Sequence, residues 1–195
     1  MDFRNAKELL KVCQEQSLSI SAVMLQRELT EGEQDPEETD RKMDRVLEIM
    51  KSAASTPIHT PVKSMGGLIG GEAKKISDHK DAGKGLCGDL LERAVIYAMA
   101  TLETNASMGV IVASPTAGSA GIVPGLLLAL QETYDLSDEQ IKQGLYNASA
   151  IGYLAMRNAT VAGAVGGCQA EVGIASAMAA SATVELMGGS NCKRC

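Results

Sequence analysis

Apolar residues recur along much of the chain at the spacing of amphipathic helices. Segments 5–16 and 19–29 each place their apolar side chains on one stripe, and we expect a short helix in each. A third helix is expected from Pro36, because Asp35 suits the N-cap and Glu38 follows it at the capping-box position. The apolar stripe of this third helix comprises Met43, Val46, Leu47, Met50 and Ala54.

Residues 55–71 break the helical pattern. Pro57, Pro61 and two Gly-Gly pairs occur in this stretch, so we expect an irregular loop and no regular helix. His59 lies between the two prolines, and its simplest interpretation is an exposed loop imidazole. His79 lies among charged residues and is also expected at the surface.

Helical spacing returns in the second half of the chain, over 89–102, over 126–134 and after Ser137. Pro124 suits the first position of the middle helix. Residues 158–184 are rich in Gly, Ala and Ser, which let helices approach one another closely. The one β-like run is 110–113 (VIVA), and it is too short to decide. We therefore predict an all-α fold, a compact helical domain of closely packed Gly/Ala/Ser-rich helices with Gly-rich loops.

Charge is distributed unevenly along the chain and suggests its organisation. Residues 1–87 hold 28 charged side chains, whereas residues 88–190 hold only 12. We expect charged N-terminal helices over 1–55, a Gly- and Pro-containing loop and connector over 56–87, and an apolar helical core over 88–190. A short polar tail, 191–195, completes the chain.

Composition excludes several classes of function. A net charge of −6, one Phe, four Tyr and no Trp disfavour binding to nucleic acid. The uncharged stretch 104–130 is interrupted by prolines and polar residues, which argues against a membrane span. Five cysteines without a regular framework, and charged residues directly after Met1 in place of a signal peptide, predict a reducing cytoplasmic setting.

A Gly-rich stretch after the helix at 89–102 is one candidate site. Backbone N–H groups and side chains here can converge on an anion, because glycines leave the backbone accessible. The alternative is a turn between two core helices that binds nothing. The candidate substrate-binding residues are Asn105, Ser107, Thr116, Gly118 and Ser119.

Cys168 is the second candidate site, because Gly166 and Gly167 precede it and leave room for a ligand or a metal. The simpler interpretation is a small buried side chain in a tightly packed helix, the usual fate of a free cysteine. Cys13, on the first predicted helix, is expected to be a packing residue. No Cys/His spacing typical of zinc sites occurs.

Four motifs occur together in the order found in one enzyme family. They are GGLIGGEAKK at 66–75, ETNASMG at 103–109, PTAGSAGIVPG at 115–125 and GGCQAEVG at 166–173. On these motifs the chain resembles the alpha subunit of iron–sulfur-dependent L-serine dehydratase (L-serine ammonia-lyase). The resemblance extends from the N-terminal helices to about Met187.

The resemblance implies a cofactor and a reaction. In this family the cysteine matching Cys168 is one of three ligands of a 4Fe-4S cluster, and the open iron binds the substrate hydroxyl as a Lewis acid. L-Serine then loses water and yields pyruvate and ammonia without pyridoxal phosphate. Lys142 is the one lysine of the apolar core and lies on an amphipathic helix, a poor setting for a Schiff base. A beta subunit is expected as partner, and the proton-abstracting base is not evident.

The chain also departs from the family. Two cluster cysteines are expected beyond the ELMGG stretch, yet the sequence ends in GGSNCKRC, so we expect a C-terminally truncated subunit whose isolated chain is inactive. Cys192 and Cys195 form a C-x-x-C in a tail that matches no family motif. Glu72 and Ser114 replace the usual Asp and Ala, which are conservative changes.

Two other functions remain open from the sequence. A related iron–sulfur cysteine desulfidase would use the same open iron on a thiol. A chain without a complete ligand set could instead be a non-catalytic helical partner or an inactive fragment. A homo-oligomer is also compatible with the sequence.

Overall fold

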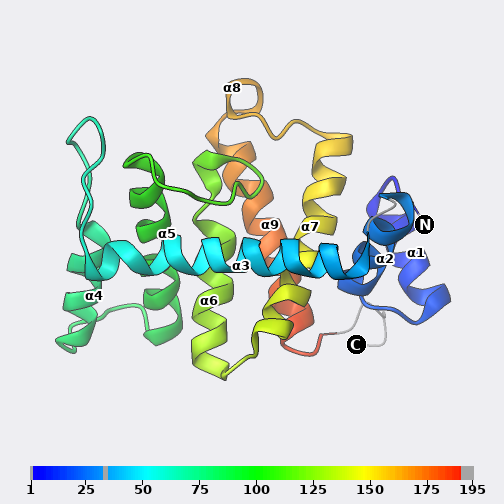
Figure 1. Ribbon diagram of the computed structural model, residues 1–195, viewed down its shortest axis with the longest axis horizontal. Coiled ribbons are helices and arrows are strands. Elements are labelled where there is room, and N and C mark those ends of the chain that lie inside the picture. The colour runs from blue at the N-terminus through cyan, green and yellow to red at the C-terminus, as the bar shows by residue number, and fades with distance from the viewer. Residues whose placement is uncertain (1, 33–34, 190–195) are drawn as a thin grey trace. The chain divides into compact units, whose positions relative to one another are not determined.

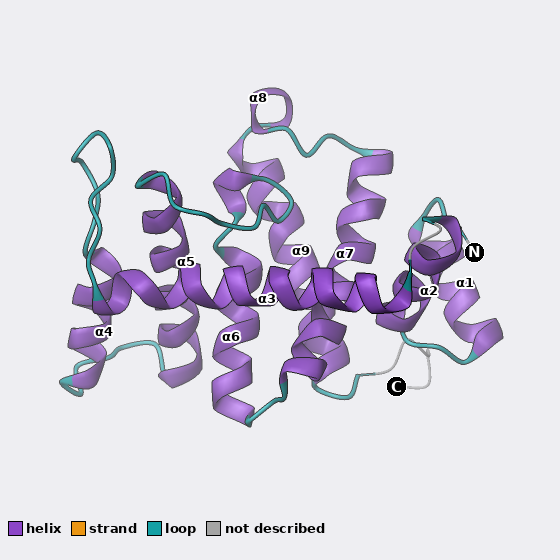
Figure 2. Ribbon diagram, in the orientation of Figure 1, coloured by secondary structure: helices purple, strands orange, loops and turns teal. Residues whose placement is uncertain are grey.

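The computed structural model describes residues 2–32 and 35–189, and all regular elements within these ranges are helices (Figure 1, Figure 2). The predicted all-α fold class is therefore confirmed, and residues 110–113 are irregular. The elements are α1 (Ala6–Gln16), α2 (Ile20–Glu31), α3 (Pro36–His59), α4 (Glu72–Asp81), α5 (Asp89–Ala106), η1 (Ala117–Ser119), α6 (Ile122–Tyr134), α7 (Asp138–Asn158), α8 (Gly163–Gly166) and α9 (Cys168–Leu186).

The chain divides into two compact units. The first contains Met1–Arg45 and Asp138–Cys195, and the second contains Val46–Ser137. Helix α3 contributes its first part to one unit and the rest to the other. The Gly-rich candidate loop belongs to the second unit, whereas Cys168 belongs to the first.

In the first unit, α7 packs against α2 and α9. Helix α9 buries alanines on one face, at Ala175, Ala179 and Ala182, so α7 can approach it closely. Gly152 of α7 lies under Met178, since a Cβ there would come within 3.2 Å of the methionine Cε. The core between α1, α2 and α7 is built from Phe3, Leu9, Cys13, Ile20, Val23, Met24, Tyr146, Ala150 and Leu154.

In the second unit, α5 packs against α4 and α6. The contact with α6 depends on glycine, because a Cβ on Gly121 would lie 2.5 Å from the carbonyl oxygen of Ala98. One turn later, a Cβ on Gly125 would lie 2.8 Å from the carbonyl oxygen of Ala94. Backbone therefore meets backbone at this interface, as the small-residue composition predicts.

Helix α3 is longer than the sequence predicts, and the expectation of a loop from residue 55 is wrong up to His59. Pro57 lies inside the helix and lacks the N–H that would bond the carbonyl of Ala53. The hydroxyl of Thr104 donates to that carbonyl oxygen at 2.9 Å. The Thr104 hydroxyl on α5 thus replaces the backbone donor that Pro57 lacks, so a buried proline is tolerated in this helix.

Other boundaries and faces also differ from expectation. Helix α4 lies within the predicted connector, and α6 begins at Ile122, which puts Pro124 at the third helical position and not the first. On α5, Leu91 and Val95 are exposed by 54% and 40%, although both belong to the apolar residues at helical spacing that predict this helix. The fully buried face of α5 is centred instead on Ile96, Ala100 and Thr101.

Among the residues that the structure describes, none of the helices combines the length and the apolar character needed to cross a membrane.

Candidate functional site

The end of α5 and the loop that follows bring together three sequence motifs of the second unit. Asn105 donates from Nδ2 to the carbonyl oxygen of Ala117 at 3.1 Å, which joins ETNASMG to PTAGSAGIVPG. Thr116 and Ser119 place their hydroxyl oxygens 3.2 Å apart across η1. Asn105, Thr116, Gly118 and Ser119 therefore lie in one local structure.

The hydroxyl groups of this loop differ in their accessibility. Ser119 is 2% exposed, and its hydroxyl donates to the carbonyl oxygen of Ser114 at 3.3 Å. Thr116 is half-buried, and Gly118 is exposed beside it. Ser107 caps the end of α5 and donates to the carbonyl oxygen of Thr104 at 3.0 Å. Ser107 is therefore bonded within the end of its own helix.

Glu103 is a structural residue that the sequence analysis did not single out. Its side chain is 2% exposed and accepts hydrogen bonds from the backbone N–H groups of Gly71 at 3.0 Å and Ala73 at 2.8 Å. These donors lie at the N-terminal end of α4, where an anion is favoured. Glu103 thereby joins the motif GGLIGGEAKK to ETNASMG. In the sequence, Glu103 is the only charged residue between Arg93 and Glu132, and this lone acid in an apolar stretch was the available signal.

The loop before α4, residues 60–71, ends at the hydrogen bonds between Glu103 and the start of this helix. It is drawn as a narrow extension at the edge of Figure 1. The backbone N–H of Met65 donates to the carbonyl of Ala106 at 3.1 Å. The backbone N–H of Ser64 donates to the carbonyl of Ile69 at 2.9 Å. Gly70 has a φ of +141°, and a Cβ there would lie 2.1 Å from the carbonyl oxygen of Val62. Only glycine fits this position.

Ser114 has a buried hydroxyl without a hydrogen-bond partner. The residue is 5% exposed and precedes Pro115 in the same loop. A buried hydroxyl that makes no bond is destabilising, because it has lost water and gained nothing. The sequence showed Ser114 only as a departure from the usual Ala.

Cys168 is exposed at the first position of α9, directly after Gly167. The interpretation of Cys168 as a small buried packing residue is therefore wrong. Gly167 has a φ of +79°, which turns the chain sharply into the helix. The thiol lies at the positive end of the α9 dipole, where an anionic ligand group is favoured.

Within 2–32 and 35–189, no group of three or more His, Cys, Asp or Glu side chains could hold a metal ion. Cys13 is buried, as predicted for a packing residue, and burial together with the nearby negative Glu185 raises the pKa of its thiol. Cys87 is exposed in the second unit. Cys192 and Cys195 lie outside the described residues. Among the described residues, Cys168 therefore has no companion side chains that would complete a cluster site.

Lys142 is buried, although its helix was predicted to be simply amphipathic. Its side chain is 4% exposed, and its ammonium group contacts the carboxylates of Asp40 at 2.7 Å, Asp44 at 2.9 Å and Glu139 at 2.7 Å. Burial by itself would lower the pKa of Lys142, but hydrogen bonds to Asp40, Glu139 and Asp44 outweigh it and raise the pKa. Lys142 is held protonated, which is unsuitable for attack on a carbonyl.

Both histidines are exposed, as predicted, although His59 is the last residue of α3 and not part of a loop. His59 lines a cavity of about 320 Å³ beside a polar cluster in the second unit. In this cluster Glu132 accepts hydrogen bonds from Arg93 and Tyr97. Burial and the negative charge of Glu132 raise the pKa of Tyr97. The charged side chains of this cluster neutralise one another.

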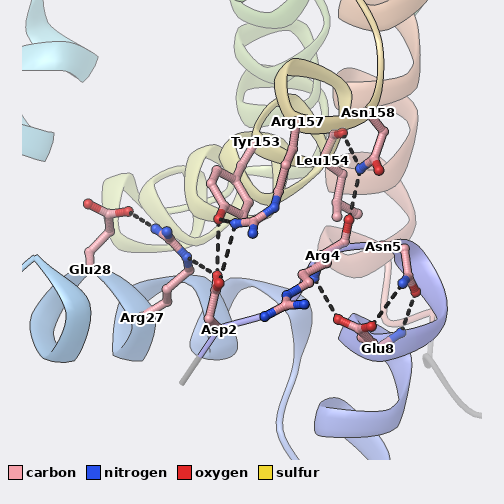
Figure 3. A network of polar contacts seen from close by, with 10 residues as sticks. All are labelled: Asp2, Arg4, Asn5, Glu8, Arg27, Glu28, Tyr153, Leu154, Arg157 and Asn158. Atoms are coloured by element: carbon pink, nitrogen blue, oxygen red, sulfur yellow. Dashed lines mark hydrogen bonds and ion pairs between the residues drawn. The ribbon is translucent and has the colours of Figure 1, made fainter.

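In the first unit, the chain's N-terminal segment is bonded to the end of α7 that leads to Cys168 (Figure 3). Asp2 accepts hydrogen bonds from Arg27 at 3.2 Å and from the Tyr153 hydroxyl at 3.0 Å, and Arg157 approaches it at 3.3 Å. Arg27 also stacks 4.0 Å above the Tyr153 ring. Asn158 donates to the carbonyl oxygen of Arg4 at 2.8 Å.

Comparison with known proteins gives a consistent result. The family model described as serine dehydratase alpha chain matches residues 15–195. The chain is similar to a protein of Bacillus subtilis named probable L-serine dehydratase, alpha chain, with 46% identity over 96% of this chain and 62% of the relative. It is also similar to the L-serine dehydratase alpha chain of Peptoniphilus asaccharolyticus, with 41% identity over 94% of this chain and 63% of the relative.

A third relative is longer. The L-serine dehydratase of Streptomyces coelicolor is 36% identical over 96% of this chain, but the match covers only 41% of that protein. The chain thus spans about three fifths of the two alpha-chain relatives and about two fifths of this one.

Proposed function

Because the chain belongs to the serine dehydratase alpha chain family, we propose that it is the alpha part of an L-serine ammonia-lyase, which converts L-serine into pyruvate and ammonia. One observation carries the proposal beyond family membership. Three motifs that are separate in sequence, at 66–75, 103–109 and 115–125, are bonded to one another around the end of α5 through Glu103 and Asn105. Such convergence is expected when the motifs serve one site.

We assign substrate binding to the loop side of this cluster. The half-buried Thr116 and the exposed backbone at Gly118 suit the carboxylate of an amino acid, because they offer donor groups without a competing negative charge. Ser119 is buried and donates its own proton to the Ser114 carbonyl, so we propose that it supports this set by holding the loop beside the Thr116 hydroxyl. Asn105 positions η1 through its bond to Ala117 and presents its amide at the same place. Ser107 completes the proposed set, with its hydroxyl available to the ammonium group as an acceptor.

Cys168 is proposed as one ligand of a 4Fe-4S cluster, the cofactor that the resemblance implies. Support comes from its exposure at the start of α9 and from the glycine on its N-terminal side. Since the described residues do not provide the remaining ligands, the complete cluster site requires groups beyond them.

The active enzyme is proposed to be a heteromer with a beta chain, acting in the cytoplasm without pyridoxal phosphate. Two of the relatives are named alpha chain, which supports a partner for those proteins. A non-catalytic helical partner or an inactive fragment is the alternative, and it is favoured because the described residues contain no group of three or more side chains that could hold a metal ion.

An assay with two substrates tests these proposals. The chain, co-expressed with a beta chain and reconstituted anaerobically with iron and sulfide, should form pyruvate from L-serine, and the isolated chain should not. Sulfide release from L-cysteine in preference to pyruvate from L-serine would indicate a desulfidase instead. A folded complex that does neither would support the non-catalytic alternative.

A further inference from the structure

The connector between α7 and Cys168 is short and tightly folded. It comprises residues 159–167 and carries α8 (Figure 1). Gly166 donates from its backbone N–H to the carbonyl of Ala162 at 2.9 Å, and Gly167 donates to the carbonyl of Gly163 at 2.8 Å. Gly163 is thus bonded to the residue that immediately precedes Cys168. Any group that fixes Gly163 also fixes the start of α9.

Glu171 lies directly against Gly163. It is the only charged residue between 158 and 184, and it lies three residues after Cys168 on the first turn of α9. At this spacing the two side chains share one face of the helix, with Cβ atoms about 5–6 Å apart. The Glu171 carboxylate reaches back across α8, because a Cβ on Gly163 would lie 2.2 Å from its Oε2 and 2.7 Å from its Cδ.

The contact between Glu171 and Gly163 requires a glycine at position 163. Gly163 has no side chain, so the carboxylate can lie directly against its backbone. An alanine at 163 would occupy the same space, and the flexible end of Glu171 would have to move away. Elsewhere on α9, Gly173 has no atom within 4 Å of an added Cβ, so the need for glycine is local to the connector.

We propose that Glu171 is a positioning residue for Cys168, acting through Gly163 and Gly167. The carboxylate closes the connector onto the first turn of α9 and thereby fixes the backbone that carries the thiol. This arrangement is independent of what Cys168 binds. Its consequence for iron retention rests on the proposed function.

The test is a double-mutant cycle with Glu171→Ala and Gly163→Ala. Each substitution removes the same contact, from one side or the other, so each should speed alkylation of Cys168 by iodoacetamide by about threefold. Because the two changes act on one contact, the double variant should be no faster than either single variant. Glu171→Gln keeps the length and shape of the side chain and should restore a rate close to that of the unmodified chain.

Two controls distinguish a positioning role of Glu171 from a general destabilisation of the fold. Peptide mapping assigns each alkylation, and the exposed thiol of Cys87 in the second unit should keep its rate in all variants. Gly173→Ala is the matched control on α9 and should leave Cys168 unchanged. Additive effects of the two alanine substitutions, or equal acceleration at Cys87 and Cys168, would overturn the proposal.

A second experiment measures the rate of iron release from the assembled, iron-loaded enzyme. There Glu171→Ala should release iron about threefold faster than the unmodified protein. Altered alkylation with unaltered iron release would leave the positioning role intact and would count against Cys168 as a ligand. The two proposals can therefore fail separately.

Discussion

Individual polar residues show what the sequence could and could not reveal. Asn105, Thr116 and Ser119 were predicted as a group from their Gly-rich setting, and the described bonds place them together. The burial of Lys142 was not predictable in this way. Its partners Asp40 and Asp44 lie about a hundred residues earlier, and helical periodicity carries no information on such pairings.

Ser114→Ala is expected to stabilise the protein by about 1 kcal/mol, because it removes a buried hydroxyl that has no partner. The urea midpoint should rise without a change in the slope of the transition. Ser107→Ala is the control, since its hydroxyl donates to Thr104 and its loss should not stabilise. An unchanged or lower midpoint for Ser114→Ala would show that the hydroxyl has a bonding partner such as an internal water.

The Lys142 cluster should respond unequally to substitutions on its two sides. Lys142→Met leaves carboxylates that are 58% to 75% exposed and can be hydrated, so a cost of about 1–2 kcal/mol is expected. Replacing Asp40 and Asp44 by Asn and Glu139 by Gln leaves a buried ammonium unpaired and should cost about 3 kcal/mol or more. Urea unfolding measures both. Equal losses would contradict the structure.

The pH dependence of this cluster follows from the direction of its shift. The pKa of Lys142 is raised above its ordinary value of 10.5, so its stabilisation is fully present below pH 10.5 and is lost as the pH rises through the higher folded-state pKa. The stability difference between the unmodified chain and Lys142→Met should accordingly stay constant through neutral pH.

Helix boundaries were predicted well where local signals decide them. Asp35 accepts a hydrogen bond from the Glu38 backbone N–H at 2.9 Å, which confirms the predicted cap of α3. The other end of α3 was misplaced, because the bond that accommodates Pro57 comes from Thr104, far along the chain. Helix α4 was missed because it is polar on nearly all sides and buries only Ala73.

Thr104→Val tests how α3 continues past Pro57. The substitution removes the donor to the Ala53 carbonyl and should cost about 1–2 kcal/mol. Pro57→Ala in the same chain restores a backbone N–H at the position that normally bonds this carbonyl, so it should recover part of the loss. Thermal unfolding of the two single variants and the double variant measures the coupling. A purely additive double variant would show that the Thr104 bond does not substitute for the helical one.

The attachment of the N-terminal segment to α7 should depend on pH. Burial alone would raise the pKa of Asp2, but hydrogen bonds from Arg27 and Tyr153 outweigh it and lower the pKa below its ordinary value of 3.8. Its stabilisation is therefore present above pH 3.8 and is lost as the pH falls through the lower folded-state pKa. Asp2→Asn should cost less than about 1 kcal/mol at pH 7, since the side chain is 39% exposed.

The corresponding measurement is thermal unfolding of both proteins between pH 7 and pH 2. The gap between the unmodified chain and Asp2→Asn should close toward the acid end. A gap that persists unchanged at pH 2 would show that the carboxylate charge is not what holds the segment to α7.

For the molecule as a whole, the sequence predicted an all-helical fold and the family, and both are confirmed. The division into two compact units was not predicted, because uneven charge separates surface from core but does not show which helices pack together. The proposed substrate-binding loop belongs to the second unit and the proposed cluster ligand Cys168 to the first. The ligand role of Cys168 can be tested most directly.

That test measures iron and sulfide in the enzyme assembled with its beta chain, alongside the thermal midpoint of the iron-free form. Cys168→Ser should lose most bound iron with little change in the midpoint, because the thiol is exposed and serine oxygen is a poor ligand for a sulfide cluster. Cys13→Ser should do the reverse, since it places a hydroxyl in the core at a cost of about 1–3 kcal/mol and should leave iron unchanged. Full iron occupancy in Cys168→Ser would contradict its role as a ligand.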